Sequence, residues 1–351
     1  MTTITEPSDA RQTAPRGSRP TFGVVLPSQR LPHEAKRDLA YELRRAATVA
    51  ADAGADTIWV WDHMLKAPVY QNSWHDPLIA LGSVADLGVR LGTGVLVAPV
   101  RPPVQTAMAV ATLQSLSRHS MRLGVGTGWN PVEFQAAGVD IKRRGSVTDE
   151  FIAVIESIFA GEQDFHGRYW NYADLTPGDV GVAPEIWIAG GSRAAGGGDL
   201  GAAEKLITAT MADTVAQRIM RQRRWIPRPT AEWSDFQADL DSLRRATGDP
   251  HAPEQVQKCI IVAGHLVETD DPAAARERQF PAFRQNLVSD KRPPAYLEER
   301  YLVGSVPEIR TRLEQWISAG MEHIGLYLLG DVPQQVGLAQ KLLGDLLAVA
   351  Q

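Results

Sequence analysis

The stretch SMRLGVGTGWNPVEFQAAGVDIKRRGSVTDE (120–150) decides the fold. It opens with a strand-like apolar run that breaks into three closely spaced glycines, followed by aromatic and polar residues: Gly124, Gly126, Gly128, Trp129, Asn130 and Glu133. Glycine at the end of a strand lets the backbone turn sharply and lets a flat ligand approach closely. Parallel α/β folds place their chemistry just beyond the carboxyl ends of the strands. The stretch therefore predicts either a ligand site or a plain strand-to-helix turn with a packed Trp.

The same strand-to-helix rhythm recurs on both sides of this stretch. Apolar runs predict eight strands, and helical patterns bounded by proline or glycine lie between them. The expected strands are 21–27, 55–63, 90–99, 121–125, 185–191, the end of 202–210, 255–265 and 323–330. Buried strands that alternate with helices pair in parallel. Eight such units favour an α/β fold of the (β/α)8 TIM-barrel type with insertions, and the alternative is an open doubly wound sheet with an appended domain.

Composition limits the classes of protein that remain. The formal net charge of −5 gives no reason to expect nucleic-acid binding, and the one cysteine, Cys259, excludes an internal disulfide and a cysteine-rich zinc site. No stretch has the apolar length needed to span a bilayer. Residues 1–20 lack the apolar core of a signal peptide and are interpreted as a disordered tail of a cytoplasmic protein.

We expect one domain over residues 21–351. Within it, the segment 265–303 is predicted to form a lid-like insertion, because loops of that length usually have a function or are disordered. Its aromatic side chains, which would select the substrate, are Phe280, Phe283, Tyr296 and Tyr301.

Two motifs at expected strand ends suggest chemistry. Asp62-His63 follows the second strand, where a histidine either exchanges a proton with a substrate or is a structural imidazole at the rim. The glycine-dense loop GGSRAAGGGDLG (190–201) follows the fifth strand, and its backbone N–H groups with Arg193 would form a phosphate site. The alternative for this loop is a flexible connection without a ligand.

A basic segment, 214–229, contains five arginines in an otherwise acidic chain: Arg218, Arg221, Arg223, Arg224 and Arg228. Such a run is either a solvated helix face or an electrostatic groove for a polyanionic ligand tail. There is no metal-ligand spacing and no Gly-x-Ser-x-Gly nucleophile motif, so neither a metalloenzyme nor a hydrolase finds support.

Several blocks together resemble the bacterial luciferase-like superfamily of flavin- and deazaflavin-dependent oxidoreductases. They are the 122–150 stretch, RLGTGVLVAPVRPPVQTAMAVATLQSLS (90–117), IWVWDH (58–63), EIWIAGGS (185–192) and YLVGSVPEIRTRLEQWISAGMEHIGLYLL (301–329). The resemblance covers roughly 21–330 and implies a (β/α)8 barrel with its cofactor ring at the carboxyl-end mouth. The ring would lie against a bulge in the third strand that often contains a non-proline cis peptide, here at Gly94-Val95.

The resemblance also implies roles for individual residues. His63 matches a ring-facing histidine of deazaflavin-dependent members, and Glu133 is either a general acid/base or a buried salt-bridge partner. The catalytic candidates are His63 and Glu133, and the cofactor-binding candidates are Asp62, Gly94, Val95, Gly128, Trp129, Asn130, Gly190, Gly191, Ser192 and Arg193. One departure is that LITATMADT (206–214) stands where the family has an Asp-Gly-aromatic ending of strand six.

The resemblance leaves three functions open. The first is an oxidoreductase that passes a hydride between coenzyme F420 and a small organic substrate. The second is a two-component monooxygenase that uses reduced FMN and O₂ and depends on a separate flavin reductase. The third is a barrel that binds a ligand without turnover, because fold does not fix function. A homodimer is expected from the resemblance alone, and no metal is expected.

Overall fold

The computed structural model describes residues 19–30, 38–65, 72–192, 211–228, 233–286 and 293–348. Eight parallel strands close into a barrel in the order β1-β12-β11-β10-β9-β6-β5-β3. Their bounds are β1 Thr21–Val25, β3 Thr57–Val60, β5 Arg90–Val97, β6 Arg122–Gly126, β9 Glu185–Ala189, β10 Arg224–Ile226, β11 Gln257–Gly264 and β12 His323–Leu328. The predicted (β/α)8 barrel is confirmed, and the open doubly wound sheet is wrong because β1 pairs with both β12 and β3.

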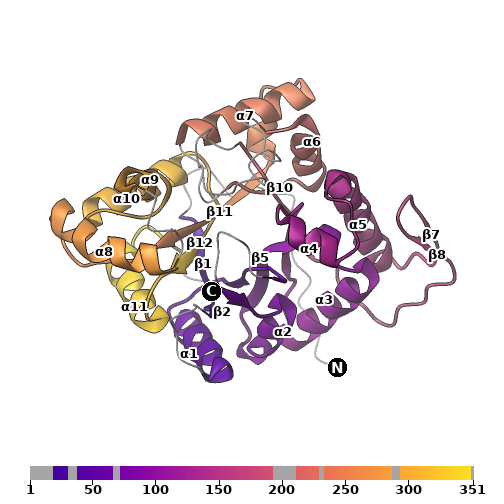
Figure 1. Cartoon of the computed structure of the whole chain (residues 1–351), viewed down its shortest axis with the longest axis horizontal. Helices are drawn as coiled ribbons and strands as arrows, with labels where there is room; N and C mark the ends of the chain where they lie inside the picture. The colour runs from indigo at the N-terminus through magenta and orange to yellow at the C-terminus, as the bar shows by residue number, and fades with distance from the viewer. Residues whose placement is uncertain are drawn as a thin grey trace.

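The helices form an outer ring around the strands (Figure 1). They are α1 Leu39–Asp52, α2 Pro77–Gly82, α3 Pro103–Ser117, α4 Pro131–Ala136, α5 Arg144–Phe159, α6 Asp213–Gln222, α7 Trp233–Thr247, α8 Pro272–Asn286, α9 Pro294–Arg300, α10 Val306–Ser318 and α11 Val332–Leu343. Short 3-10 turns occupy Ala85–Leu87, Ala98–Val100, Ile141–Arg143 and Ala252–Gln255. Side-chain caps fix where several helices begin, as where Asp38 accepts from the backbone N–H of Tyr41. Within the described ranges, no helix combines the length and hydropathy that a membrane span requires.

Two small antiparallel pairs stand outside the barrel. β2 Gln29–Arg30 pairs with β4 Ser73–Trp74, and β7 Phe165–His166 pairs with β8 Asn171–Tyr172. The second pair forms a hairpin after α5, and Figure 1 shows it projecting beyond that helix. The first pair brings the segment before α2 back over the end of β1.

The sixth barrel strand lies elsewhere than predicted. β10 occupies this place, and its Trp225 pairs with Ile188 of β9 while its Arg224 pairs with Gln257 of β11. The apolar run at 202–210, from which the sixth strand was expected, lies outside the described residues. The prediction failed because β10 has three residues, begins with arginine and follows a charged helix, so it has no apolar run to detect.

One tryptophan fills much of the barrel interior. The Trp59 side chain is fully buried, and the strands on both sides of it carry glycine. A Cβ atom added at Gly23 would lie 2.5 Å from Nε1 of Trp59, and one at Gly92 would lie 2.5 Å from its Cε3. These two glycines leave the space that the indole needs. Trp59 packs within an inner cluster that also contains Trp187, Ile261 and Tyr327.

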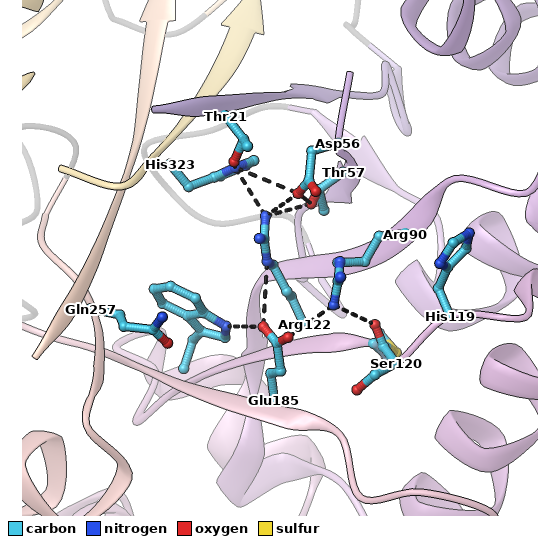
Figure 2. Close-up of polar contacts among 12 residues, drawn as sticks. Thr21, Asp56, Thr57, Arg90, His119, Ser120, Arg122, Glu185, Gln257 and His323 are labelled. Atoms are coloured by element: carbon cyan, nitrogen blue, oxygen red, sulfur yellow. Dashed lines mark hydrogen bonds and ion pairs between the residues drawn. The ribbon is translucent and has the colours of Figure 1, made fainter. Parts of the chain in front are cut away.

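A buried polar network closes the amino end of the barrel (Figure 2). Arg122 donates to Asp56 (2.5 Å) and Thr57 (2.7 Å), and its Nε lies 3.5 Å from a carboxylate oxygen of Glu185. Nε2 of His323 accepts a hydrogen bond from the indole N–H of Trp59 (3.0 Å), and its Nδ1 lies 2.8 Å from the Thr21 hydroxyl and 2.9 Å from Nη1 of Arg122. Burial and the nearby Arg122 charge hold the pKa of His323 well below its ordinary value. This end of the barrel is held together by groups that bind one another.

Candidate active site

Most of the predicted site residues lie at the carboxyl ends of the barrel strands. This end of the barrel is called the mouth. The third barrel strand, β5, carries a register irregularity between Thr93 and Leu96, and the peptide bond Gly94-Val95 is cis. The predicted bulge and its cis peptide are thus confirmed at the position that the resemblance gave. This agreement supports the match between β5 and the corresponding block of the family at the level of single residues.

Two glycines of the stretch 120–150 are required because β6 lies very close to the bulge in β5. A Cβ atom at Gly124 would lie 2.1 Å from the carbonyl oxygen of Thr93, and one at Gly126 would lie 2.8 Å from Cγ2 of Val95. Side chains at these positions would push β6 away from β5. Gly128 has a φ of 70° and makes the turn that leads to Trp129 and α4.

His63 and Glu133 form a pair at this mouth. Nδ1 of His63 lies 3.2 Å from Oε1 of Glu133, although the two residues are 70 positions apart in sequence. The same carboxylate oxygen accepts hydrogen bonds from the backbone N–H groups of Met64 (2.8 Å) and Leu65 (3.2 Å). Because a carboxylate only accepts, Nδ1 of His63 carries the proton, and Nε2 is the ring nitrogen on the side away from Glu133.

Glu133 is ionised and buried. Burial alone would raise its pKa, but the hydrogen bonds from His63, Leu65 and Met64 outweigh burial and bring the pKa below its ordinary value. Its side chain is 1% exposed, whereas that of His63 is 11% exposed. Glu133 therefore fixes the tautomer and orientation of His63, and His63 is the member of the pair that reaches the surface of the mouth.

Asp62, next to His63, is held by other protein groups. Its Oδ2 accepts from the backbone N–H of Val97 (2.9 Å) and from Nε of Arg101 (2.8 Å), and its Oδ1 accepts from Arg101 (2.7 Å). Arg101 also donates to Asp76, the cap of α2 (2.9 Å). The carboxylate ties the end of β3 to the end of β5 and thereby sets where His63 stands.

Aromatic side chains line the mouth around His63. Its ring centroid is 4.7 Å from that of Trp74 and 5.7 Å from that of Trp129, and Trp61 packs on Tyr327 at 5.4 Å. Among the described residues, three buried side-chain nitrogens in this neighbourhood have no hydrogen-bond partner: Nε1 of Trp61, Nε1 of Trp74 and Nδ2 of Asn130. Buried donors normally find acceptors, so flat walls with unpaired donors suit a ring that carries carbonyl or hydroxyl oxygens. The ring portion of a flavin or deazaflavin fits here.

The expected phosphate site is arranged differently. The backbone N–H of Ser192 donates to both carboxylate oxygens of Asp239 on α7 (2.7 and 2.8 Å), and the Ser192 hydroxyl donates to the same group. Gly190 donates its N–H to the carbonyl oxygen of Ile226 (3.3 Å), and Gly191 has a φ of 151°. Arg193 lies outside the described residues. A protein carboxylate thus takes the Ser192 donors, and the rest of the loop, 193–201, lies outside the described residues.

Four of the five arginines in the basic segment lie away from the mouth. Arg218 and Arg221 are on α6 and bind Asp149 (2.8 and 2.7 Å), and Arg223 caps that helix and binds Gln255 (2.6 Å). Arg224 is the first residue of β10, at the amino end of the barrel. Arg228 alone of these five follows the carboxyl end of β10, beside Asp239. The interpretation as a groove for a polyanionic tail is therefore wrong for this cluster as a unit.

Asp239 is the site residue that the sequence analysis missed. The sequence pattern could have revealed it, because Asp239 has the spacing of the apolar residues Phe236 and Leu243 on one face of α7, and all three are buried. An acidic residue in the apolar phase of a helix requires a buried partner. No group of three His, Cys, Asp or Glu side chains suited to a metal ion occurs within the described residues.

Fold and mouth place the chain among the (β/α)8 barrels that carry their chemistry on the carboxyl-end loops. It matches the model of the luciferase-like monooxygenase family over residues 21–323, and the chain belongs to that family. It is therefore a luciferase-like oxidoreductase or monooxygenase, a family whose solved structures include both FMN- and F420-containing enzymes.

The similar proteins include one named as a monooxygenase component and one named as a ketoreductase. The oxygenase component of the flavin-dependent trigonelline monooxygenase of Acinetobacter baylyi is 24% identical over 164 residues, which is 44% of this chain and 44% of that protein. The match thus spans less than half of that relative. The phthiodiolone/phenolphthiodiolone dimycocerosates ketoreductase of Mycobacterium kansasii is 29% identical over 348 residues, covering 80% of this chain and 89% of the relative.

Solved structures share the fold at low identity. The monooxygenase RslO1 from Streptomyces bottropensis superposes with a TM-score of 0.70 and 18% identity, covering 93% of this chain and 99% of that one. An F420-dependent secondary alcohol dehydrogenase, in complex with an F420–acetone adduct, gives a TM-score of 0.68 and 15% identity, with 94% and 100% covered.

Proposed function

We propose that this protein transfers a hydride between coenzyme F420 and the carbonyl or alcohol carbon of a small organic substrate. The observation that carries the proposal is the His63–Glu133 pair beside the cis-peptide bulge. The deazaflavin, when bound, supplies or accepts the hydride. The relative whose match spans most of both chains is named a ketoreductase, and ketone reduction is a reaction of this kind.

The protein's own contribution is the proton. A carbonyl that receives a hydride becomes an alkoxide, and it needs a proton on oxygen to leave as an alcohol. Glu133 holds Nδ1–H of His63, so the opposite nitrogen, Nε2, is the atom assigned to the proton transfer. In ketone reduction the ring starts as the imidazolium and Nε2–H gives its proton to the alkoxide, which leaves the neutral ring with its proton on Nδ1; in alcohol oxidation the neutral Nε2 accepts the proton. Trp74 and Trp129 restrict the ring of His63 to this orientation and exclude water from it.

Substrate selection is assigned to the segment 265–303. Its described parts are α8 and α9 with the turn that follows, and they place Phe283, Leu297 and Tyr301 in the inner cluster beside Tyr327. Phe280 and Tyr296 pack against the same cluster. These aromatic side chains lie between the outer helices and the mouth, where the organic part of a substrate would be placed.

A two-component FMN monooxygenase is the second candidate. One observation favours it: Arg218, Arg221, Arg223 and Arg224 lie away from the mouth, which removes the argument that they hold the long anionic tail of F420. The trigonelline relative is named as an oxygenase component, and such a component would need a separate flavin reductase as its partner.

Equilibrium binding separates the two candidates. Oxidised and reduced F420 and oxidised and reduced FMN are titrated into the purified protein, and binding is read from fluorescence or calorimetry. The proposal predicts that both redox forms of F420 bind and that a panel of ketones and aldehydes reoxidises reduced F420 on the protein. Binding of reduced FMN alone, with O₂ consumption, would replace the hydride-transfer proposal by the monooxygenase.

A further inference from the structure

The loop at the end of β9 contains a carboxylate where the family resemblance leads one to expect a ligand phosphate. The Asp239 side chain is fully buried, and both of its oxygens lie 2.7–2.8 Å from the backbone N–H of Ser192. It comes from α7, more than forty residues later in the chain than the loop it fills.

The loop is shaped to receive this carboxylate. A Cβ atom at Gly191 would lie 2.4 Å from Oδ2 of Asp239, so a larger residue there would drive the carboxylate out. The φ of 151° at Gly191 is also one that L side chains rarely adopt. The glycine, the serine hydroxyl and the Ser192 N–H together form a site that holds one carboxylate from inside the protein.

The charges around Asp239 leave it an anion at mildly alkaline pH. Burial raises the pKa of Asp239 to about 6, although the Ser192 hydrogen bonds and the nearby Arg228 act in the opposite direction. Asp235, one turn earlier on α7, adds negative charge. A ligand phosphate that approaches Ser192 therefore meets a fixed negative charge and occupied donors.

We infer that Asp239 is a specificity-determining residue that discriminates against the terminal phosphate of FMN. An FMN phosphate is close to a dianion at neutral pH, whereas the phosphodiester of F420 carries a single charge. Repulsion by a neighbouring carboxylate scales with the ligand's charge, so the monoester is disfavoured more strongly than the diester. The inference rests on the proposed function, in that it takes the cofactor to be a flavin or deazaflavin.

The ratio of FMN affinity to riboflavin affinity measures what the phosphate contributes. Because the two ligands share the ring, changes at the ring site cancel in this ratio. At pH 8 we expect wild-type protein to bind FMN within tenfold of riboflavin. Asp239→Asn keeps the shape and removes the charge, and we expect it to raise the ratio at least tenfold while F420 affinity changes less.

Asp241→Asn is the matched control. Asp241 is on the same helix, has a 63% exposed side chain and pairs with Arg244, so removing its charge should leave the ratio unchanged. A wild-type ratio above tenfold, or a ratio that does not rise in Asp239→Asn, overturns the inference. The wild-type ratio decides by itself if Asp239→Asn does not fold.

Inorganic phosphate separates this inference from the proposed function. If neither flavin nor F420 binds, the proposed cofactor class fails, but the site at Ser192 can still be tested. About 20 mM phosphate at pH 8 should raise the thermal unfolding midpoint of Asp239→Asn and leave that of wild type unchanged, because a ligand stabilises only the folded state it binds. Equal midpoint shifts in the two proteins would overturn the role given to Asp239.

Discussion

The two ends of the barrel each contain a histidine beside a carboxylate, and the two are used differently. At the amino end, His323 is 1% exposed, and its ring nitrogens face Trp59, Thr21 and Arg122. At the carboxyl end, His63 binds Glu133 through one nitrogen and keeps an 11% exposed side chain. Residue type is therefore a poor guide to chemistry, and the exposure of the ring at the barrel end where it lies is a better one.

The carboxylates show the same contrast. The pKa of Asp56 at the amino end is about 2, because Arg122 outweighs the effect of burial. The pKa of Asp239 at the carboxyl end is about 6, because burial outweighs the hydrogen bonds from Ser192. At the amino end the cationic partner outweighs the cost of burying the Asp56 carboxylate, and at the carboxyl end the fold does not fully compensate the buried Asp239 charge. Such incomplete compensation is common at functional sites.

The largest expected effect is loss of turnover on replacing His63. His63→Ala should lower kcat by about 10²–10⁴-fold, the usual contribution of a general acid, while F420 binding stays within a few fold. The rate is measured with the carbonyl compound that reoxidises reduced F420 fastest. His119→Ala is the control, because His119 is exposed at the amino end and its ring bonds the carbonyl oxygen of Gly88. Equal rates for wild type and His63→Ala would remove His63 from the reaction.

Breaking the amino-end network should cost stability and leave chemistry intact. Arg122→Met leaves Asp56 without its main cationic partner, and we expect a loss of about 3 kcal/mol in unfolding free energy at pH 7. The folded pKa of Asp56 is depressed, so its contribution, about 2 kcal/mol, is present above pH 4 and is lost as pH falls toward 2.

The loss caused by Arg122→Met should therefore be smaller at pH 3 than at pH 7 when both are measured by chemical denaturation. Arg44→Met is the control, since Arg44 pairs with Asp86 at the surface and should change stability by less than about 1 kcal/mol. A loss that does not depend on pH would mean that the charge pairing is not what stabilises this end.

The stability contribution of Asp239 should change with pH in the direction opposite to that of Asp56. Its folded pKa of about 6 lies above its ordinary value, so the folded state binds the proton more tightly than the unfolded state. Stability then falls as pH rises from about 4 to about 7, by up to about 3 kcal/mol. Relative to wild type, Asp239→Asn should gain stability over this range in phosphate-free buffer. A difference in unfolding free energy between the two proteins that does not change with pH would show that burial does not destabilise the Asp239 carboxylate.

Glu133→Gln should have a smaller effect than His63→Ala. The amide oxygen still accepts from the backbone and from His63, but the charge that orients and supports the imidazole is gone. We expect kcat to fall by about tenfold with KM unchanged, and Glu133→Asp to recover part of the loss. A rise in KM with an unchanged kcat would instead indicate that Glu133 only shapes the binding pocket.

The smallest effect is expected from the arginines of α6. Arg221→Ala and Arg223→Ala should change F420 affinity by less than twofold, because their side chains bind Asp149 and Gln255 on the outside of the barrel. Arg228→Ala is the informative partner, since Arg228 lies beside Asp239 at the mouth. Loss of F420 binding in Arg221→Ala would instead support the interpretation of the basic segment as a groove for a polyanionic ligand tail.

The sequence predicted the barrel because seven of its strands are apolar runs next to helices with clear ends. It also located the β5 bulge, since Gly94 and Val95 lie within the block 90–117 that resembles the family. It failed at β10, whose three residues form a strand only because β9 and β11 supply hydrogen bonds on both sides. Local sequence does not contain that information.

At the site, the positions that depend on strand ends were predicted and the long-range partners were not. His63 and Glu133 were each found from their place after a strand, but their hydrogen bond joins β3 to α4. Asp239 was missed because its partner, Ser192, lies in another βα unit. The charge run did not predict one surface, because the arginines of 214–229 are divided between α6, where Arg218 is buried, and both ends of β10.

Trp59 and the glycines that make room for it have a kinetic consequence. Because the indole and its neighbours Trp187 and Ile261 occupy the barrel interior, the mouth is closed from below. Cofactor and substrate must then pass through the same opening. Under the proposed function the cofactor ring lies deepest, against Val95, so it has to arrive before the substrate and depart after the product. Steady-state measurements should accordingly show a compulsory order of addition, in which the oxidised and reduced cofactor compete with each other because both bind the free protein.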